Sequence, residues 1–227
     1  MAGRRFRAVL LDWRRTIVHD DLSWWVPESL KSIGRPADAA TVESIERRVI
    51  AAFDRPEYME IERTIDRSAD LHRQGMMTIF GWAGLDDELA EVLYEQDLKP
   101  ASHLLYPDVP EMLEAVRALG VKTALLSNIH FDLRPELKEQ AILDLFDSVI
   151  LSYEHGIQKP DPRLFQLALD ELGVGPAEAL MVGDSPTNDG GAAMLGIATL
   201  ILPPQEEFGP HGLDIVVDVL RGSAPGG

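Results

Sequence analysis

Several stretches of the sequence place polar side chains where they could carry out chemistry on a phosphate group. A carboxylate can attack phosphorus and form a covalent intermediate that water then hydrolyses. Because this attack brings two anions together, it needs positive charge nearby. The chain offers residues of these types close to the ends of apolar runs, namely Asp12, Ser127, Asn128, Lys159, Asp184 and Asp189. Together they predict one site for phosphoryl chemistry.

Most of these residues also have an ordinary structural interpretation. Asp12 could cap the turn after a core strand, and Ser127 could cap a helix. Asp184 and Asp189 could be a cap and a first-turn acid of a helix. Lys159, which precedes a Pro-Asp-Pro sequence, could lie solvated in a loop. All of them, however, fall at a strand end or in an adjacent loop, where open α/β sheets carry their catalytic groups. This joint placement favours the catalytic interpretation.

The elements that must position these side chains alternate between strand and helix. Asp108 and Glu111 have the spacing of a capping box for a helix over 109–119, and Gly120 supplies its left-handed stop. The alternation predicts an α/β fold with a Rossmann-like, doubly wound parallel sheet and helices on both faces. The predicted strands are 6–11, 121–127, 148–151, 179–182, 197–202 and 215–219, and the predicted helices are 109–119, 135–140, 161–172 and 186–195.

Residues 18–100 lose the strand pattern and have helical spacing instead. Val42, Ile45, Val49 and Phe53 recur at intervals of three and four residues, which is typical of an amphipathic helix. Further helices are predicted over 66–80 and 86–98. We therefore predict an all-helical cap at 18–100, inserted into a core formed by 1–17 and 101–221, and a disordered tail at 222–227.

In this order, the motifs resemble those of the haloacid dehalogenase (HAD) superfamily of hydrolases. The family's first motif, an apolar strand followed by Asp-x-Asp-x-Thr, falls on residues 12–16. A Ser or Thr that closes a strand falls on Ser127, and Lys-Pro-Asp-Pro before a helix begins at Lys159. The fourth motif, Gly-Asp-Ser followed by Asn-Asp, falls on residues 183–189. The helical insertion is similar to the cap that these enzymes place over their site.

The resemblance implies a role for each motif residue in a phosphatase that acts on a small phosphorylated metabolite. Asp12 would form an aspartyl-phosphate, and Thr16 would fix the turn behind it. Lys159 would hold the nucleophile and the phosphoryl group, while Ser127 and Asn128 would bind phosphoryl oxygens. The implied ligands of Mg²⁺, the implied cofactor, are the carboxylate of Asp12, the backbone carbonyl of Arg14, Asp184 and Asp189.

Arg14 departs from the family pattern. Phosphatase members carry at this position a second aspartate, which protonates the leaving oxygen and then activates water. Arginine stays protonated at physiological pH, so acid–base assistance worth about 10²–10⁴-fold would be missing. His19, Asp20, Asp21 or His72 could replace this acid.

Three other readings stay open at Arg14. The chain could be a 2-haloacid dehalogenase-type hydrolase, in which Arg14 would bind a substrate carboxylate. It could be phosphonatase-like, because that branch also places Trp after the nucleophile. That branch needs a Schiff-base lysine in its cap, however, and the only candidates here are Lys31 and Lys99. It could also be a catalytically weakened protein that binds a phosphorylated ligand or a partner.

Composition narrows the choice of partners and compartment. The net charge of -17, from 38 acidic and 21 basic residues, repels nucleic acid and anionic lipid. The absence of cysteine excludes disulfides, thiolate zinc sites and a cysteine nucleophile. Asp12 interrupts the first apolar run before it could form an export signal, and no run approaches the length of a membrane span. We expect a cytoplasmic monomer or homodimer.

Overall fold

A parallel sheet forms the centre of the α/β core in the computed structural model, which describes residues 6–20, 23–98, 103–205 and 207–222. Its five strands lie in the order β5-β4-β1-β6-β7, and every neighbouring pair is parallel. This arrangement confirms the predicted α/β class. Residues 223–227 of the predicted tail lie outside the described ranges. The strands are β1 (Ala8–Leu11), β4 (Lys122–Ser127), β5 (Ser148–Leu151), β6 (Ala179–Gly183) and β7 (Ala198–Ile201).

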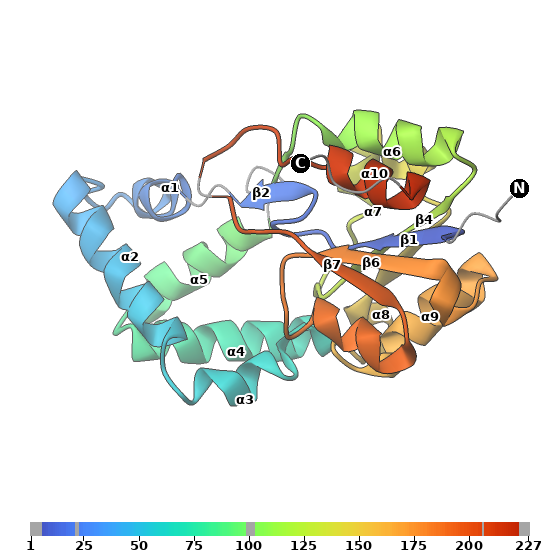
Figure 1. Ribbon diagram of the computed structural model, residues 1–227. Helices are drawn as coiled ribbons and strands as arrows, with labels where there is room; N and C mark the ends of the chain where they lie inside the picture. The colour runs from blue at the N-terminus through green and yellow to red at the C-terminus, as the bar shows by residue number, and fades with distance from the viewer. Residues whose placement is uncertain (1–5, 21–22, 99–102, 206, 223–227) are drawn as a thin grey trace, which may run out of the picture.

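Helices cover both faces of this sheet (Figure 1). Successive side chains of a strand point to opposite faces. Val9 and Leu11 therefore join one core cluster, while Ala8 and Leu10 join another. The first face carries α6 (Val109–Ala118), α7 (Arg134–Glu139) and α10 (Asp214–Arg221), and the second carries α8 (Ser152–His155) and α9 (Pro162–Leu172).

The remaining helices pack together beside the sheet, and we call them the helical unit (Figure 1). Val49, Ile79, Phe80 and Leu93 lie at the centre of its separate hydrophobic core. Within the described residues, no helix is both long and apolar enough to cross a membrane. The unit consists of α1 (Trp25–Ser32), α2 (Ala39–Phe53), α3 (Tyr58–Glu62), the 3₁₀ turn η1 (Ile65–Arg67), α4 (Ala69–Trp82) and α5 (Asp87–Asp97).

The start of the insertion differs from the all-helical prediction. β2 (Val18–Asp20) pairs antiparallel with β3 (His103–Leu105), with Val18 opposite Leu105. Each of these strands has three residues, which is too short to produce a recognisable alternation. Their pairing also joins the two sides of the helical unit. Local sequence therefore could not reveal it.

The prediction of a last strand over 215–219 was wrong. This segment belongs to α10, in which Val216, Val217 and Leu220 are buried together with the preceding Leu213. Their spacing of three and four residues places them on one helical face, which packs against α6. A short apolar run alone does not distinguish strand from helix.

Two further local predictions need correction. The segment predicted as a helix over 186–195 forms the 3₁₀ helix η5 (Asp189–Leu195), whose Gly190 and Gly191 disfavour an α-helix. Asp108 makes no side-chain cap on α6. Its carboxylate instead accepts from the backbone amides of His211, at 3.0 Å, and Leu213, at 2.9 Å. It thus ties the approach to α10 to the start of α6.

Candidate active site

The carboxyl ends of three neighbouring strands bring the predicted motifs together. Leu11 of β1 is in register with Leu125 of β4 and Val182 of β6. Asp12, the next residue, donates its backbone amide to the Val182 carbonyl at 3.0 Å. Ser127 is the last residue of β4 and Asp184 follows β6, so both lie at the same edge of the sheet. The predicted gathering at strand ends is therefore present.

Lys159 joins two of the aspartates. Its Nζ lies 2.8 Å from Asp12 Oδ1 and 2.6 Å from Asp189 Oδ1, and its side chain is 1% exposed. The backbone amide of Ser185 donates to Asp189 Oδ2 at 2.9 Å. A Cβ on Gly183 would lie 2.1 Å from that same oxygen, so the approach of Asp189 requires glycine there. Asp12, Asp184 and Asp189, together with Lys159, are called the acidic cluster below.

Burial dominates the electrostatics of this cluster. Burial raises the pKa of Asp12 to about 7. The nearby ammonium of Lys159 lowers this pKa, whereas the carboxylates of Asp189 and Asp184 add to the rise. Burial alone would lower the pKa of Lys159, but Asp12 and Asp189 raise it above its usual value. Burial also raises the pKa of Asp184, opposed by Arg15, whose Nε lies 3.4 Å from Asp184 Oδ2. The cluster thus concentrates negative charge around one buried cation.

Asn128 positions Lys159 through its amide group. Its Nδ2 donates to the Lys159 carbonyl at 3.1 Å, and its Oδ1 accepts from the Lys159 amide at 2.7 Å. Both polar ends of the side chain are therefore engaged with the lysine backbone. Asn128 also lines the cavity, and its predicted contact with phosphate stays a prediction.

Thr16 does not fix the turn through its hydroxyl. Its Oγ1 is buried and, among the described residues, has no hydrogen-bond partner. The Thr16 carbonyl instead lies 3.0 Å from His211 Nδ1, and its amide donates to the Trp13 carbonyl at 3.4 Å. The turn is therefore held by backbone contacts.

A cavity of about 870 Å³ lies over the acidic cluster. The sequence predicted that Arg14 would lie at the site but did not predict Arg15. Only the position of Arg15 next to Arg14 could have indicated its role. It also missed the contribution of the helical unit, because nothing in a helical pattern tells which residues face another unit. The charged and polar residues that line the cavity include Asp12, Arg14, Arg15, Ser127, Lys159 and Asp184 from the sheet side, and Tyr58, Glu62 and Asp66 from the helical unit.

The acids predicted to replace the missing aspartate do not reach this cavity where the structure describes them. The ring of His19 contacts Tyr106, and His72 lines a neighbouring cavity. The Asp20 side chain and Asp21 lie outside the described residues, as does Lys99 of the phosphonatase-type alternative. The other lysine of that alternative, Lys31, pairs with Glu28 at the surface, 2.6 Å away.

The donor set fits Mg²⁺. Asp12, Asp184 and Asp189 each offer a carboxylate oxygen, and these atoms lie within 4.8 Å of one another. Mg²⁺ prefers such hard oxygen ligands and retains water at its other positions. The contribution of the Arg14 backbone carbonyl stays a prediction. The residues present could therefore hold the ion that the motifs imply.

Comparison with known proteins places the chain in a family. A family model described as haloacid dehalogenase-like hydrolase matches residues 6–196. Phosphoserine phosphatase of Thermus thermophilus is 42% identical over 112 residues, which cover 48% of this chain and 44% of that protein. (S)-2-haloacid dehalogenase 4A of Burkholderia cepacia is 37% identical over 111 residues, which cover 46% of this chain and 48% of that protein. The matches thus span about half the length of these curated relatives.

Solved structures show the same likeness over nearly the whole chain. A HAD phosphatase from Thermococcus onnurineus has a TM-score of 0.63 and 25% identity, covering 96% of this chain and 99% of that one. The matched range 6–196 includes β1 with Asp12 as well as Lys159, Asp184 and Asp189, which the fold brings to one edge of the sheet. The chain therefore belongs to the haloacid dehalogenase-like hydrolase family.

Proposed function

We propose that this protein is a Mg²⁺-dependent phosphohydrolase that releases phosphate from a small phosphorylated metabolite through an aspartyl-phosphate on Asp12. The acidic cluster carries the proposal. Its three carboxylates lie within reach of a single ion, and Lys159 contacts the proposed nucleophile at 2.8 Å. This combination supports attack by a carboxylate on an anionic phosphate, which requires nearby positive charge.

The contacts of Asp12 suggest which oxygen attacks. Lys159 Nζ and the Trp13 amide, at 2.8 and 2.7 Å, both approach Oδ1. Oδ2 would then form the bond to phosphorus while the bond from phosphorus to the leaving oxygen breaks. The leaving oxygen would take up a proton as it departs. Water would next attack phosphorus, give up a proton, break the bond to Oδ2 and restore the carboxylate. Ser127, which lines the cavity, would donate to a phosphoryl oxygen.

The metal site has its own part in this scheme. Asp12, Asp184 and Asp189 would hold Mg²⁺, and the ion when bound would offset the charge of the phosphoryl oxygens. Lys159 would remain between Asp12 and Asp189, where its ammonium favours the ionised form of the nucleophile and fixes it in place. Positioning and charge would therefore provide most of the catalysis.

The helical unit could supply the missing proton transfer. Glu62 and Asp66 add carboxyl groups to the cavity wall that Arg14 also lines. Tyr58 is a poor base there, because burial raises its pKa to about 12, with Glu62 and Asp66 adding to the rise. Arg14→Asp tests the need for an acid: if proton transfer limits turnover, phosphate release rises. An unchanged or lower rate would support another acid or a direct role of Arg14 in binding.

The decisive experiment is a screen of phosphate monoesters with and without Mg²⁺, using Asp12→Asn. We expect metal-dependent phosphate release that falls by more than about 10³-fold in the variant, since removal of a nucleophile eliminates the covalent route. Asp144→Asn, at an exposed position, is the matched control and keeps full activity. Phosphate release that survives Asp12→Asn contradicts the proposal.

A second candidate is hydrolysis of a 2-haloacid. Arg14 and Arg15 both line the cavity with Asp12, and arginine binds carboxylates in a bidentate manner. Halide release from 2-haloacids without Mg²⁺, lost in both Asp12→Asn and Arg14→Met, would favour it. If neither phosphate nor halide is released while beryllofluoride binds with Mg²⁺, a phospho-ligand-binding protein is favoured instead.

A further inference from the structure

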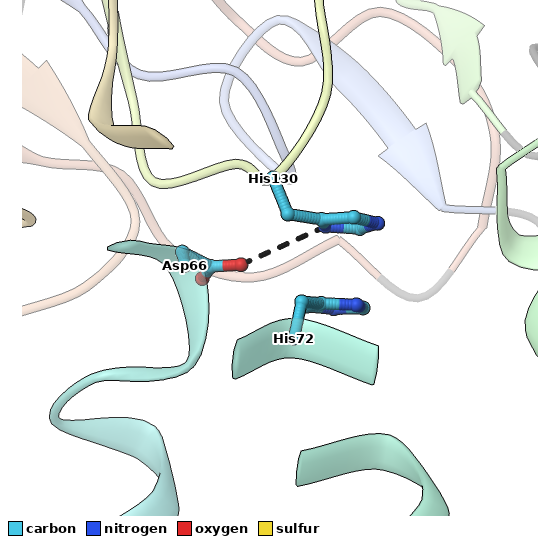
Figure 2. A group of neighbouring side chains, drawn as sticks. All are labelled: Asp66, His72 and His130. Atoms are coloured by element: carbon cyan, nitrogen blue, oxygen red, sulfur yellow. Dashed lines mark ion pairs between the residues drawn. The ribbon is translucent and has the colours of Figure 1, made fainter. Parts of the chain in front are cut away.

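A second group of metal-type side chains lies where the helical unit meets the sheet (Figure 2). Asp66 comes from η1 and His72 from α4 of the helical unit, whereas His130 follows β4 of the sheet. One potential ligand atom from each residue lies within 4.8 Å of the other two. We call these residues the histidine cluster. Phosphoryl transfer as proposed above uses neither histidine.

The two imidazole rings lie face to face. Their centroids are 3.3 Å apart, their planes differ by 6°, and His130 Nδ1 lies 3.8 Å from Asp66 Oδ1. With Zn–N bonds of about 2.0–2.1 Å, two nitrogens of a tetrahedral zinc site lie about 3.4 Å apart. The stacked rings lie close enough to share one ion, but their lone pairs lie in parallel ring planes, so both rings would have to rotate to point them at it.

Burial makes the arrangement unusual for two histidines without further function. His72 is 6% exposed and His130 is 4% exposed. His130 Nε2 is buried and has no hydrogen-bond partner among the residues that the structure describes. A buried polar atom without a partner needs an explanation, and a bound ion with its waters is one that proteins commonly provide. A cavity of about 190 Å³, lined by all three cluster residues, has room for these waters.

The backbone around the cluster is held in place from both sides. The Ser152 hydroxyl donates to the Asp66 carbonyl at 2.6 Å and accepts from the amide of Ile129, next to His130, at 2.9 Å. Gln158 Oε1 accepts from the Asp66 amide at 3.0 Å. Asp66 and His130 are therefore carried on segments already joined to each other, which reduces the entropy lost when they close on an ion.

We propose that Asp66, His72 and His130 form a binding site for a divalent transition-metal ion of the Zn²⁺ type, with water completing the coordination. Two imidazoles and a carboxylate suit zinc, whereas Mg²⁺ favours sites made of oxygen alone. The ion would link the helical unit to the sheet. It would also fix Asp66, which lines the cavity over the acidic cluster. This site does not depend on the proposed phosphohydrolase activity.

Calorimetric titration of Zn²⁺ into the full chain, in excess Mg²⁺ to occupy the acidic cluster, tests the site. One Zn²⁺ is expected to bind, with affinity lowered more than about tenfold in His72→Phe and in His130→Gln. His155→Gln changes an exposed histidine outside the cluster and keeps the wild-type affinity. Because the readout is heat of binding, it is independent of any phosphate release.

A second measurement protects the test against misfolding. Co²⁺ replaces Zn²⁺ as a visible probe, and its absorption band in the wild type is expected to disappear in Asp66→Asn, whose side chain is the least buried of the three. Circular dichroism checks that each variant folds. No zinc binding by the wild type, or equal affinity in the two histidine variants and the wild type, overturns the proposal.

Discussion

The acidic cluster and the histidine cluster have the same size but opposite construction. In each, three potential ligand atoms lie within 4.8 Å of one another. The potential ligand atoms of the acidic cluster are all oxygens, and a buried cation, Lys159, lies beside them. Two of the three potential ligand atoms in the histidine cluster are nitrogens, and the residues come from both the helical unit and the sheet.

The difference teaches what holds each cluster together. Parallel pairing of β1 with β6 fixes Asp12 and Asp184 side by side whatever the helical unit does. His72 and His130 meet only because α4 packs against the segment after β4. The acidic cluster should therefore respond to loss of charge compensation, and the histidine cluster to loss of contact between the two units.

The largest effect is expected from Lys159→Met, which would break the acidic cluster alone. The change leaves the carboxylates of Asp12 and Asp189 buried without their cation, and removal of one partner from a buried ion pair destabilises proteins by about 3–5 kcal/mol. Thermal and denaturant unfolding would measure the loss. Mg²⁺ is expected to restore part of it by mass action. Lys138→Met, at an exposed position, should have no such effect; equal melting temperatures of both variants would refute the role of Lys159.

A smaller loss is expected from Asn128→Ala, which removes the support of Lys159 rather than its charge. Both hydrogen bonds to the Lys159 backbone disappear, and the buried groups left behind cost about 1–3 kcal/mol. Urea unfolding gives the stability change, and kcat should fall more than KM rises because the ammonium is misplaced. Gln166→Ala is the exposed amide control. A pure KM effect would argue for direct substrate binding by Asn128.

Ser152→Ala is expected to loosen the histidine cluster selectively. It removes the hydroxyl that joins the Asp66 carbonyl to the Ile129 amide, a loss of about 1–2 kcal/mol. Zn²⁺ affinity should decrease while the Mg²⁺ requirement of phosphate release stays the same. If both metal dependences shift equally, the two clusters are not independent and the comparison fails.

The smallest effect concerns an exposed ion pair on the surface of the helical unit, away from both clusters. The hydrogen bond from Arg35 lowers the pKa of Asp86 to about 2, helped by the Leu89 amide. Since the folded pKa lies below the unfolded one, the stabilisation is complete above about pH 4 and is lost as pH falls through about 2. An NMR titration of the Asp86 carboxyl should show this value, and a higher one in Arg35→Met. Zn²⁺ affinity at neutral pH should not change.

The acidic cluster was accessible from the sequence because its rules are local. Apolar runs mark buried strands, and parallel strands place the residues after them at one edge. Asp12, Ser127 and Asp184 follow from these rules, and Lys159 and Asp189 follow from their motifs. The strand register and the hydrogen-bond partners did not follow from them. The side-chain amide of Asn128 bonds to the Lys159 backbone, and the Thr16 hydroxyl has no hydrogen-bond partner among the described residues.

The helical unit shows the limit of the same reasoning. Spacing of apolar residues predicted the helices near Val49 and Leu93, because burial of one face repeats with the helical period. It could not predict that Asp66 lies over the acidic cluster, nor the pairing of β2 with β3. These contacts join segments far apart in the chain and leave no periodic signal.

By itself the sequence determined the α/β class, the helical insertion and the residues of the acidic cluster, since strand ends and short motifs encode them within a few neighbouring positions. Only the tertiary structure decided that Arg15 pairs with Asp184, that Asp108 joins α6 to the approach to α10, and that His72 stacks on His130. The physical reason is packing: side chains from separate elements meet where surfaces fit, and that fit is a property of the whole fold.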